Sequence, residues 1–268
     1  MIKASFGLTK EPFSRETPEL LPQQKQPLEI IKTHAQHGGF SVVIGSPGVG
    51  KSTLREHMQQ LGKEKNVVVV SFSRTMHTYL QLLKQLAESF KIDVPDKGLE
   101  KALIQTAFDH IRDRKTLYTL IDEAHLLDMT ALRKLRLLFD QFPKKHNLVL
   151  FGEQDLLYYL SLTVNEDIKS RITYSKTILP LSDHELEQYI ITELEVVRLG
   201  ANTYDEAALE LIIRSSQGNL RSCRNLCYSS LIEVCRENKR VVTISHVNNV
   251  LIQPHWRSHE ELIKQQVN

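Results

Sequence analysis

The chain has 268 residues, of which 41% are hydrophobic and 25% charged, a composition typical of folded globular proteins that argues against disorder. No apolar run approaches the roughly 18 residues that a membrane-spanning helix needs, and the first residues lack the apolar core of a signal peptide, so we expect a cytoplasmic protein without a membrane partner. The formal net charge of +2 does not by itself imply a nucleic-acid partner.

Strands and helices alternate over the first two-thirds of the chain. Continuous apolar runs, which suit strands buried on both faces, cover residues 40–44, 66–72, 117–121 and 147–152. Helical patterns lie between them over residues 52–61, 76–90, 98–114 and 130–142. The alternation predicts an α/β fold, a parallel sheet flanked by helices whose ligands bind at the carboxyl ends of the strands.

From about residue 181 the pattern is almost entirely helical, over residues 183–199, 205–216, 220–236 and 245–251. Ser182 with Glu185 fits a capping box, and Thr203 is expected to cap the following helix. We therefore place an α/β domain in residues 1–180, with a linker and a helix in its first 38 residues. Residues 181–268 are expected to form a small all-helical domain with a C-terminal tail.

The segment GSPGVGKST matches the phosphate-binding loop pattern GxxxxGK[ST], between a predicted strand and a predicted helix. Its glycines permit a tight turn whose backbone N–H groups can face a triphosphate. Lys51 can reach the β- and γ-phosphates, and the hydroxyl of Ser52 can bind Mg²⁺. We predict that ATP and Mg²⁺ bind here, through Gly45, Ser46, Pro47, Gly48, Val49, Gly50, Lys51, Ser52 and Thr53.

A second motif, LYTLIDE at residues 117–123, places an acidic pair after an apolar strand, as in the Walker B pattern. Asp122 is expected to hold Mg²⁺ together with Ser52, and Glu123 to polarise the attacking water, which predicts hydrolysis as well as binding. Asp122 to His125 also spells a DEAH box. The sequence shows no second RecA-like domain and no convincing set of further helicase motifs, so we expect His125 to pack or hydrogen-bond at the strand end.

Several weaker motifs follow one another in a characteristic order. They are FGL at 6–8 with PF at 12–13, GGFSVVIGSPGVGKSTL at 38–54, LIDEAH at 120–125, FGEQDL at 151–156, SRI at 170–172, LPL at 179–181 and QGNLR at 217–221. With these marks the chain resembles the AAA+ ATPases, and more narrowly the ExeA or general secretion pathway protein A-like group that includes TniB- and MuB-type transposition ATPases. The resemblance implies a P-loop AAA+ core followed by a helical lid domain.

The resemblance makes Arg171 the arginine finger. Such a finger acts in trans on the γ-phosphate bound by a neighbouring subunit, so it implies a homo-oligomer, either a ring or a helical filament. The alternative is a surface arginine that pairs with Glu166 or Asp167.

Two further roles follow from the resemblance. Arg221 is expected to be sensor 2, with Arg224 one turn along the helix as an alternative. Sensor 1, a polar residue after the fourth strand, falls on Gln154 or Glu153.

The resemblance also suggests a task. The leading hypothesis is a regulator of transposition that assembles on double-stranded DNA with ATP bound and recruits or activates a transposase; the expected absence of a membrane anchor favours this role. The alternatives are the cytoplasmic ATPase of a type II secretion or cell-envelope assembly system, and a nucleotide-dependent scaffold with little hydrolysis. Basic side chains that suit phosphate contacts, or else form solvated helix faces, are Arg74, Lys84, Arg133, Lys134 and Arg136.

Overall fold

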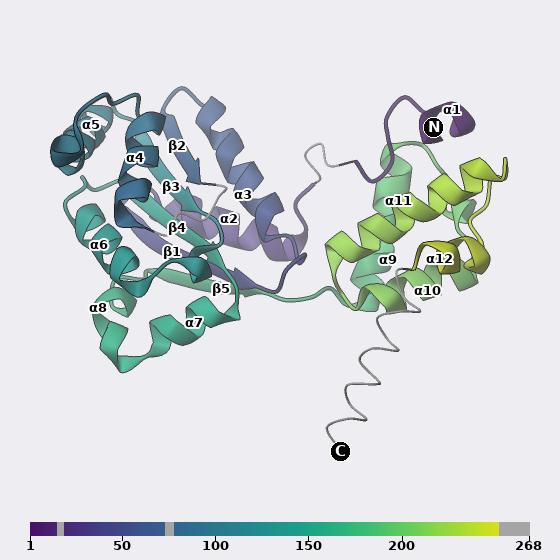
Figure 1. Cartoon of the computed structure of the whole chain (residues 1–268). Coiled ribbons are helices and arrows are strands. Elements are labelled where there is room, and N and C mark those ends of the chain that lie inside the picture. The colour runs from purple at the N-terminus through teal and green to yellow at the C-terminus, as the bar shows by residue number, and fades with distance from the viewer. Residues whose placement is uncertain (15–18, 73–77, 252–268) are drawn as a thin grey trace, which may run out of the picture. The chain divides into compact units, whose positions relative to one another are not determined.

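The computed structural model describes residues 1–14, 19–72 and 78–251 (Figure 1). The chain divides into two compact units, one of Thr17–Leu179 and one of Met1–Glu16 together with Pro180–Asn268. The boundary between Leu179 and Pro180 is one residue from the predicted boundary between residues 180 and 181. The first residues differ from expectation, because they cluster with the helical unit and not with the α/β domain.

The first unit is built on a five-stranded sheet of order β2-β3-β4-β1-β5, in which every neighbouring pair is parallel. This confirms the predicted fold class. The sheet holds one strand that the sequence did not predict, β5, whose segment YSKTI is only partly buried at an edge and lacks a continuous apolar run. The strands are β1 (Gly39–Gly45), β2 (Val67–Phe72), β3 (Thr116–Ile121), β4 (His146–Gly152) and β5 (Tyr174–Ile178).

Helices cover both faces of this sheet (Figure 1). Because side chains alternate along a strand, Val42 and Ile44 belong to one core and Val43 to the other. The face of Val43 packs against α2 (Pro22–His34) and α3 (Lys51–Gln60). The opposite face packs against α4 (Tyr79–Ser89), α5 (Leu99–Arg112), α6 (Met129–Asp140), α7 (Gln154–Ser161) and α8 (Glu166–Lys169).

The second unit is helical, as predicted, and includes the short α1 (Ile2–Phe6) from the start of the chain. Ile2 is buried, and the ring of Phe13 lies 6.5 Å from that of Tyr189, centroid to centroid. Ile2 and Phe13 therefore belong to the core of this unit. Its other helices are α9 (Asp183–Val196), α10 (Glu206–Ser216), α11 (Leu220–Arg236) and α12 (Ile244–Val250).

Two predicted helix caps have different outcomes. The capping box of α9 is confirmed, since Ser182 accepts from the backbone of Glu185 and Glu185 accepts from the backbone of Ser182. The cap expected at Thr203 is wrong, because Asp205 accepts from the N–H of Ala208 at 2.7 Å and begins α10. Asp205 directly precedes the first helical residue, the position from which a side chain reaches the third N–H. None of the helices in the described ranges is both long and apolar enough to cross a bilayer.

Candidate active site

The glycine-rich loop connects the carboxyl end of β1 to the amino end of α3, as its motif predicts. A Cβ at Gly45 would lie 2.7 Å from Cγ2 of Val49 and 2.9 Å from the carbonyl oxygen of Ile178, so only glycine fits there. Gly48 and Gly50 have φ values of 82° and 103°, in the region that favours glycine. The loop is thus a narrow turn formed from backbone, as phosphate binding requires.

Lys51 lies inside this loop and is 6% exposed. Its Nζ donates to the carbonyl oxygens of Gly45, at 2.6 Å, and Ser46, at 3.1 Å. Ser52 and Thr53 follow, half-buried in the first turn of α3. A cation is therefore held within the turn, next to the N-terminus of a helix, where negative charge is favoured.

Gln24, which the sequence did not identify, holds the end of the loop that leads into α3. Gln24 of α2 is fully buried, and its Nε2 donates to the carbonyl oxygen of Gly50 at 3.1 Å. A glutamine in a polar helix gives no signal for this role in the sequence, because the contact joins segments 26 residues apart.

Asp122 directly follows β3, at the same carboxyl ends of the strands, and is 8% exposed. Its Oδ1 accepts from the N–H of Glu123, and its Oδ2 lies 3.3 Å from Nε of Arg55. Arg55 is on α3, the helix that the loop begins, so this ion pair brings the two predicted motifs together. The sequence did not identify Arg55, which looks like any polar residue of a helix.

Glu123 follows in a left-handed conformation, with φ 52°, and its side chain is 43% exposed. Nδ1 of His125 lies 3.6 Å from the Glu123 carboxylate, and Nε2 lies 3.9 Å from that of Glu153. The three side chains place their ligand atoms within 4.8 Å of one another. Between the two sensor 1 candidates, the structure brings Glu153 to the acidic pair, whereas Gln154 is exposed in the first turn of α7.

The donor set fits a magnesium nucleotide. The hydroxyl of Ser52 and the carboxylate of Asp122 are hard oxygen ligands of the kind that Mg²⁺ takes in phosphate sites. The loop that precedes Ser52 offers backbone N–H groups and Lys51 to the phosphates. These assignments remain predictions that the geometry accommodates.

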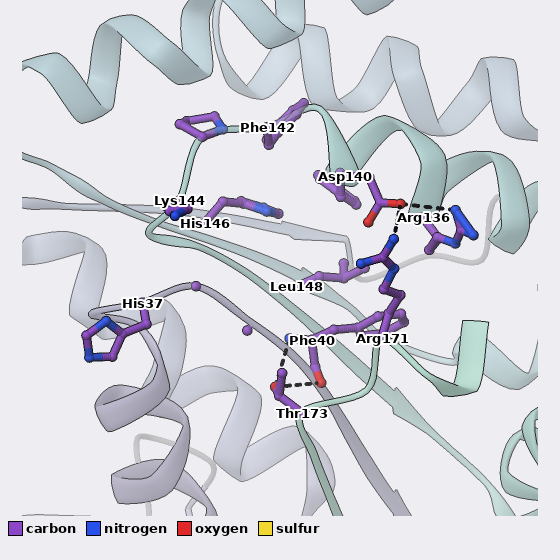
Figure 2. A pocket seen from close by; sticks show the side chains of 14 residues that line it. His37, Phe40, Arg136, Asp140, Phe142, Lys144, His146, Leu148, Arg171 and Thr173 are labelled. Carbon is purple, nitrogen blue, oxygen red and sulfur yellow. Dashed lines mark hydrogen bonds and ion pairs between the residues drawn. The ribbon is translucent and has the colours of Figure 1, made fainter. Parts of the chain in front are cut away.

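Arg171 lies at the opposite ends of the strands from the glycine-rich loop, where it lines a pocket of about 350 Å³ (Figure 2). The pocket is at the amino ends of β1 and β4, next to Phe40 and His146. The Arg171 side chain is 58% exposed, and its Nη2 lies 3.6 Å from Oδ2 of Asp140. Its acidic neighbour is therefore Asp140, and not the Glu166 or Asp167 expected for a surface arginine.

This position separates Arg171 from the glycine-rich loop of its own chain. Gly45 pairs with Ile178 at the carboxyl end of β5, and Arg171 precedes Tyr174 at the amino end. At about 3.3 Å per residue, Tyr174 lies roughly 13 Å before Ile178. Arg171 precedes that strand, so its guanidinium belongs to the edge away from the loop.

The other cationic candidate, Arg221, belongs to the helical unit. It is exposed in the first turn of α11, and Arg224 is half-buried one turn further along. Its role as sensor 2 remains a prediction.

The candidate DNA contacts have partners within the chain. Arg133 donates to Asp167, which also lies 3.6 Å from Arg136. Arg136 also forms an ion pair with Asp140, and Lys84 forms one with Asp96. Nζ of Lys134 lies 5.8 Å from the ring centroid of Tyr79. Arg74 lies outside the described residues. Much of this positive charge is thus compensated locally.

Comparison with known families gives the decisive observation. Residues 33–160, which hold the glycine-rich loop, Asp122 and Glu123, match the family model described as AAA domain. Residues 33–160 therefore form an AAA domain. The AAA domain accounts for the parallel sheet and for the two motifs at its carboxyl edge, and it confirms the predicted resemblance to AAA+ ATPases.

Beyond the AAA domain, the chain is similar to General secretion pathway protein A of Aeromonas hydrophila, with 29% identity over 242 residues. That match covers 85% of this chain and 44% of the relative, so the chain spans less than half of the relative's length. It supports the ExeA-like character of the domain. The likeness in role to TniB- and MuB-type ATPases stays a prediction.

Solved structures share the AAA+ fold at low identity. Cdc6p from Pyrobaculum aerophilum has a TM-score of 0.69 and 19% identity, over 86% of this chain and 67% of that one. The Aeropyrum pernix ORC1 protein in complex with DNA has a TM-score of 0.68 and 15% identity, over 88% and 67%. At these identities the likeness shows the fold alone.

Proposed function

We propose that this chain hydrolyses ATP within an assembly of its own copies, and that the cycle regulates a macromolecular partner. The observation that carries the ATPase site is the Arg55–Asp122 ion pair, which joins the helix of the phosphate-binding loop to the acidic strand end. Binding and hydrolysing groups are thereby gathered at one edge of the sheet.

Each residue has a defined part in this proposal. Lys51 and the loop N–H groups hold the phosphates, and Ser52 and Asp122 hold Mg²⁺. When bound, the metal neutralises charge on the phosphates. Glu123, exposed beside Asp122, orients the water that attacks the γ-phosphate.

The assembly follows from Arg171. Its guanidinium is exposed at the edge opposite the loop of its own chain, so it suits the nucleotide of a neighbouring copy. An arginine supplied in trans stabilises charge that develops on the γ-phosphate during transfer. Hydrolysis then requires at least two copies, arranged as a ring or a filament.

For the partner we propose double-stranded DNA, with a transposase or another recombination protein recruited to it. Support comes from the resemblance to TniB- and MuB-type ATPases and from the shared fold with an ORC1 protein solved in complex with DNA. Because Arg133, Arg136 and Lys84 are ion-paired, the contacts must draw on exposed lysines such as Lys144 and Lys145, repeated over many subunits.

A second candidate function is an ATPase of a secretion or cell-envelope assembly system. The observation that favours it is the 29% identity to General secretion pathway protein A. A third reading, a scaffold with little hydrolysis, is disfavoured because Glu123 stands beside Asp122 with its carboxylate accessible.

Phosphate release measured with and without linear duplex DNA separates these candidates. The DNA role predicts a severalfold stimulation that weakens as salt rises from about 50 to about 200 mM, because phosphate contacts release counterions. Glu123→Gln is the control and should release no phosphate while still binding ATP. A wild-type rate that duplex DNA leaves unchanged would contradict the DNA role and favour the secretion candidate; no release at all would favour the scaffold.

A further inference from the structure

Lys51 and Arg55 are buried cations of the site. The hydrolysis cycle described above gives a role to Lys51 but none to Arg55. Arg55 is 9% exposed, on the first turns of α3, and its Nε faces Oδ2 of Asp122 at 3.3 Å. The other carboxylate oxygen of Asp122 accepts from the N–H of Glu123. Both oxygens of the expected metal ligand are therefore engaged by the chain itself.

The pairing of Arg55 is incomplete. Its Nε and Nη1 are buried, yet neither has a hydrogen-bond partner among the described residues. A guanidinium has five N–H donors and stays charged at any physiological pH, so buried donors without acceptors are costly. A fully paired arginine would instead hold a carboxylate through two parallel hydrogen bonds. The Arg55–Asp122 contact is thus an ion pair that a better set of partners can replace.

We propose that Arg55 is an internal counter-ion that occupies Asp122 in the nucleotide-free protein, so that a divalent cation gains this carboxylate only together with a nucleotide. The proposal rests on the function proposed above. A metal alone must displace a tethered positive charge and then lie close to it, which is unfavourable at low dielectric. Nucleotide phosphates change this balance, because they bring negative charge and acceptor oxygens for the unpaired N–H groups of Arg55.

The first test needs no variant. Mn²⁺, used in place of Mg²⁺, is titrated into the full chain and followed by electron paramagnetic resonance, with and without a non-hydrolysable ATP analogue. We expect the protein to bind Mn²⁺ at least tenfold more weakly without the analogue than with it, after correction for Mn²⁺ bound by the free analogue. Equal affinity in the two conditions would overturn the proposal.

The second test removes the charge. Arg55→Gln should raise the Mn²⁺ affinity of the nucleotide-free protein at least tenfold, and adding Asp122→Asn should abolish the gain. Arg55→Lys keeps a cation and should stay within about threefold of wild type, as should Arg112→Gln, which removes an exposed arginine that pairs with Asp109. No gain in Arg55→Gln, or an equal gain in Arg55→Lys, would contradict the counter-ion role.

Loss of one partner from a buried ion pair can unfold a protein, so thermal denaturation accompanies each variant. If Arg55→Gln does not fold, Arg55→Met takes its place, because the wild-type titration can overturn the proposal but does not by itself assign the effect to Arg55. Failure of the proposed function looks different, since the wild-type protein would then bind neither the analogue nor Mn²⁺ with it. Binding of both, without dependence of the metal on the nucleotide, would remove only the role of Arg55.

Discussion

Lys51 is the side chain on which nucleotide binding depends most directly. It is buried among the loop carbonyl oxygens of Gly45 and Ser46, where it can turn to phosphate oxygens without leaving the loop. Hydrogen bonds to charged groups contribute about 1.5–3 kcal/mol each, so we expect Lys51→Ala to weaken ATP binding roughly 100-fold. A fluorescent nucleotide titration measures this, with exposed Lys63→Ala as the control. An affinity of Lys51→Ala within about threefold of wild type would refute the assignment.

His146, at the amino end of β4, gives the protein a pH-dependent stability. It is buried against Phe139 and Phe142 and shares a hydrogen bond with Thr119, and burial lowers its pKa to about 3. The unfolded chain takes up the proton near pH 6.5, so His146 stabilises the fold fully above that value and loses this contribution as pH falls toward 3.

The expected loss is at most about 1.4 kcal/mol per pH unit between roughly pH 6.5 and 3. Urea denaturation of wild type and His146→Gln at pH 7, 6, 5 and 4 measures it, since glutamine keeps a hydrogen-bonding group that does not titrate. The variant should lose less stability than wild type on acidification. Parallel pH profiles for the two proteins would contradict the role of His146.

At the residue scale, the sequence predicted the groups that belong to contiguous motifs and missed those that reach the site from elsewhere. Lys51, Asp122 and Glu123 could be found because their chemistry requires fixed spacing. Gln24 and Arg55 could not, because each acts through one contact formed only in the folded chain.

At the scale of elements, continuous apolar runs made four strands predictable. Such a run is typical of a strand covered on both faces, as β1, β3 and β4 are, whereas β2 is apolar but only partly buried at one edge of the sheet. The edge strand β5 has three consecutive polar residues between Tyr174 and Ile178 and carried no such signal. Helices α7 and α8, which are short and follow β4 closely, were also not predicted.

The capping box that begins α9 makes a prediction for the helical unit. Ser182→Ala removes the acceptor for the N–H of Glu185 and should lower the free energy of unfolding by about 1 kcal/mol. Urea denaturation followed by circular dichroism measures the change, with exposed Gln188→Ala in the same helix as the control. Equal stability of the two variants would show that the cap contributes nothing.

At the scale of the whole molecule, each proposed catalytic centre needs two groups of residues, and one chain carries them at opposite ends of its parallel strands. The carboxyl edge holds the nucleotide groups, and the amino edge presents Arg171 beside Asp140 (Figure 2). The strands of the sheet separate these two groups within one copy, since Gly45 pairs with Ile178 at the carboxyl end of β5 and Arg171 precedes Tyr174 at the amino end. The proposed mechanism therefore requires contact between copies for activity.

Mixing two inactive variants tests this claim most directly. Arg171→Ala keeps an intact nucleotide site but lacks the finger, and Lys51→Ala keeps the finger but lacks the site. Arg171→Ala alone should release phosphate at least roughly 1,000-fold more slowly than wild type, the effect of losing such an arginine. Lys51→Ala alone should also release little phosphate at ATP concentrations near the wild-type Kd, because it binds ATP roughly 100-fold more weakly. An equimolar mixture should recover a substantial fraction of the wild-type rate, since Arg171 of one variant then faces the nucleotide of the other. A mixture no more active than its components, or an Arg171→Ala variant as active as wild type, would contradict the account.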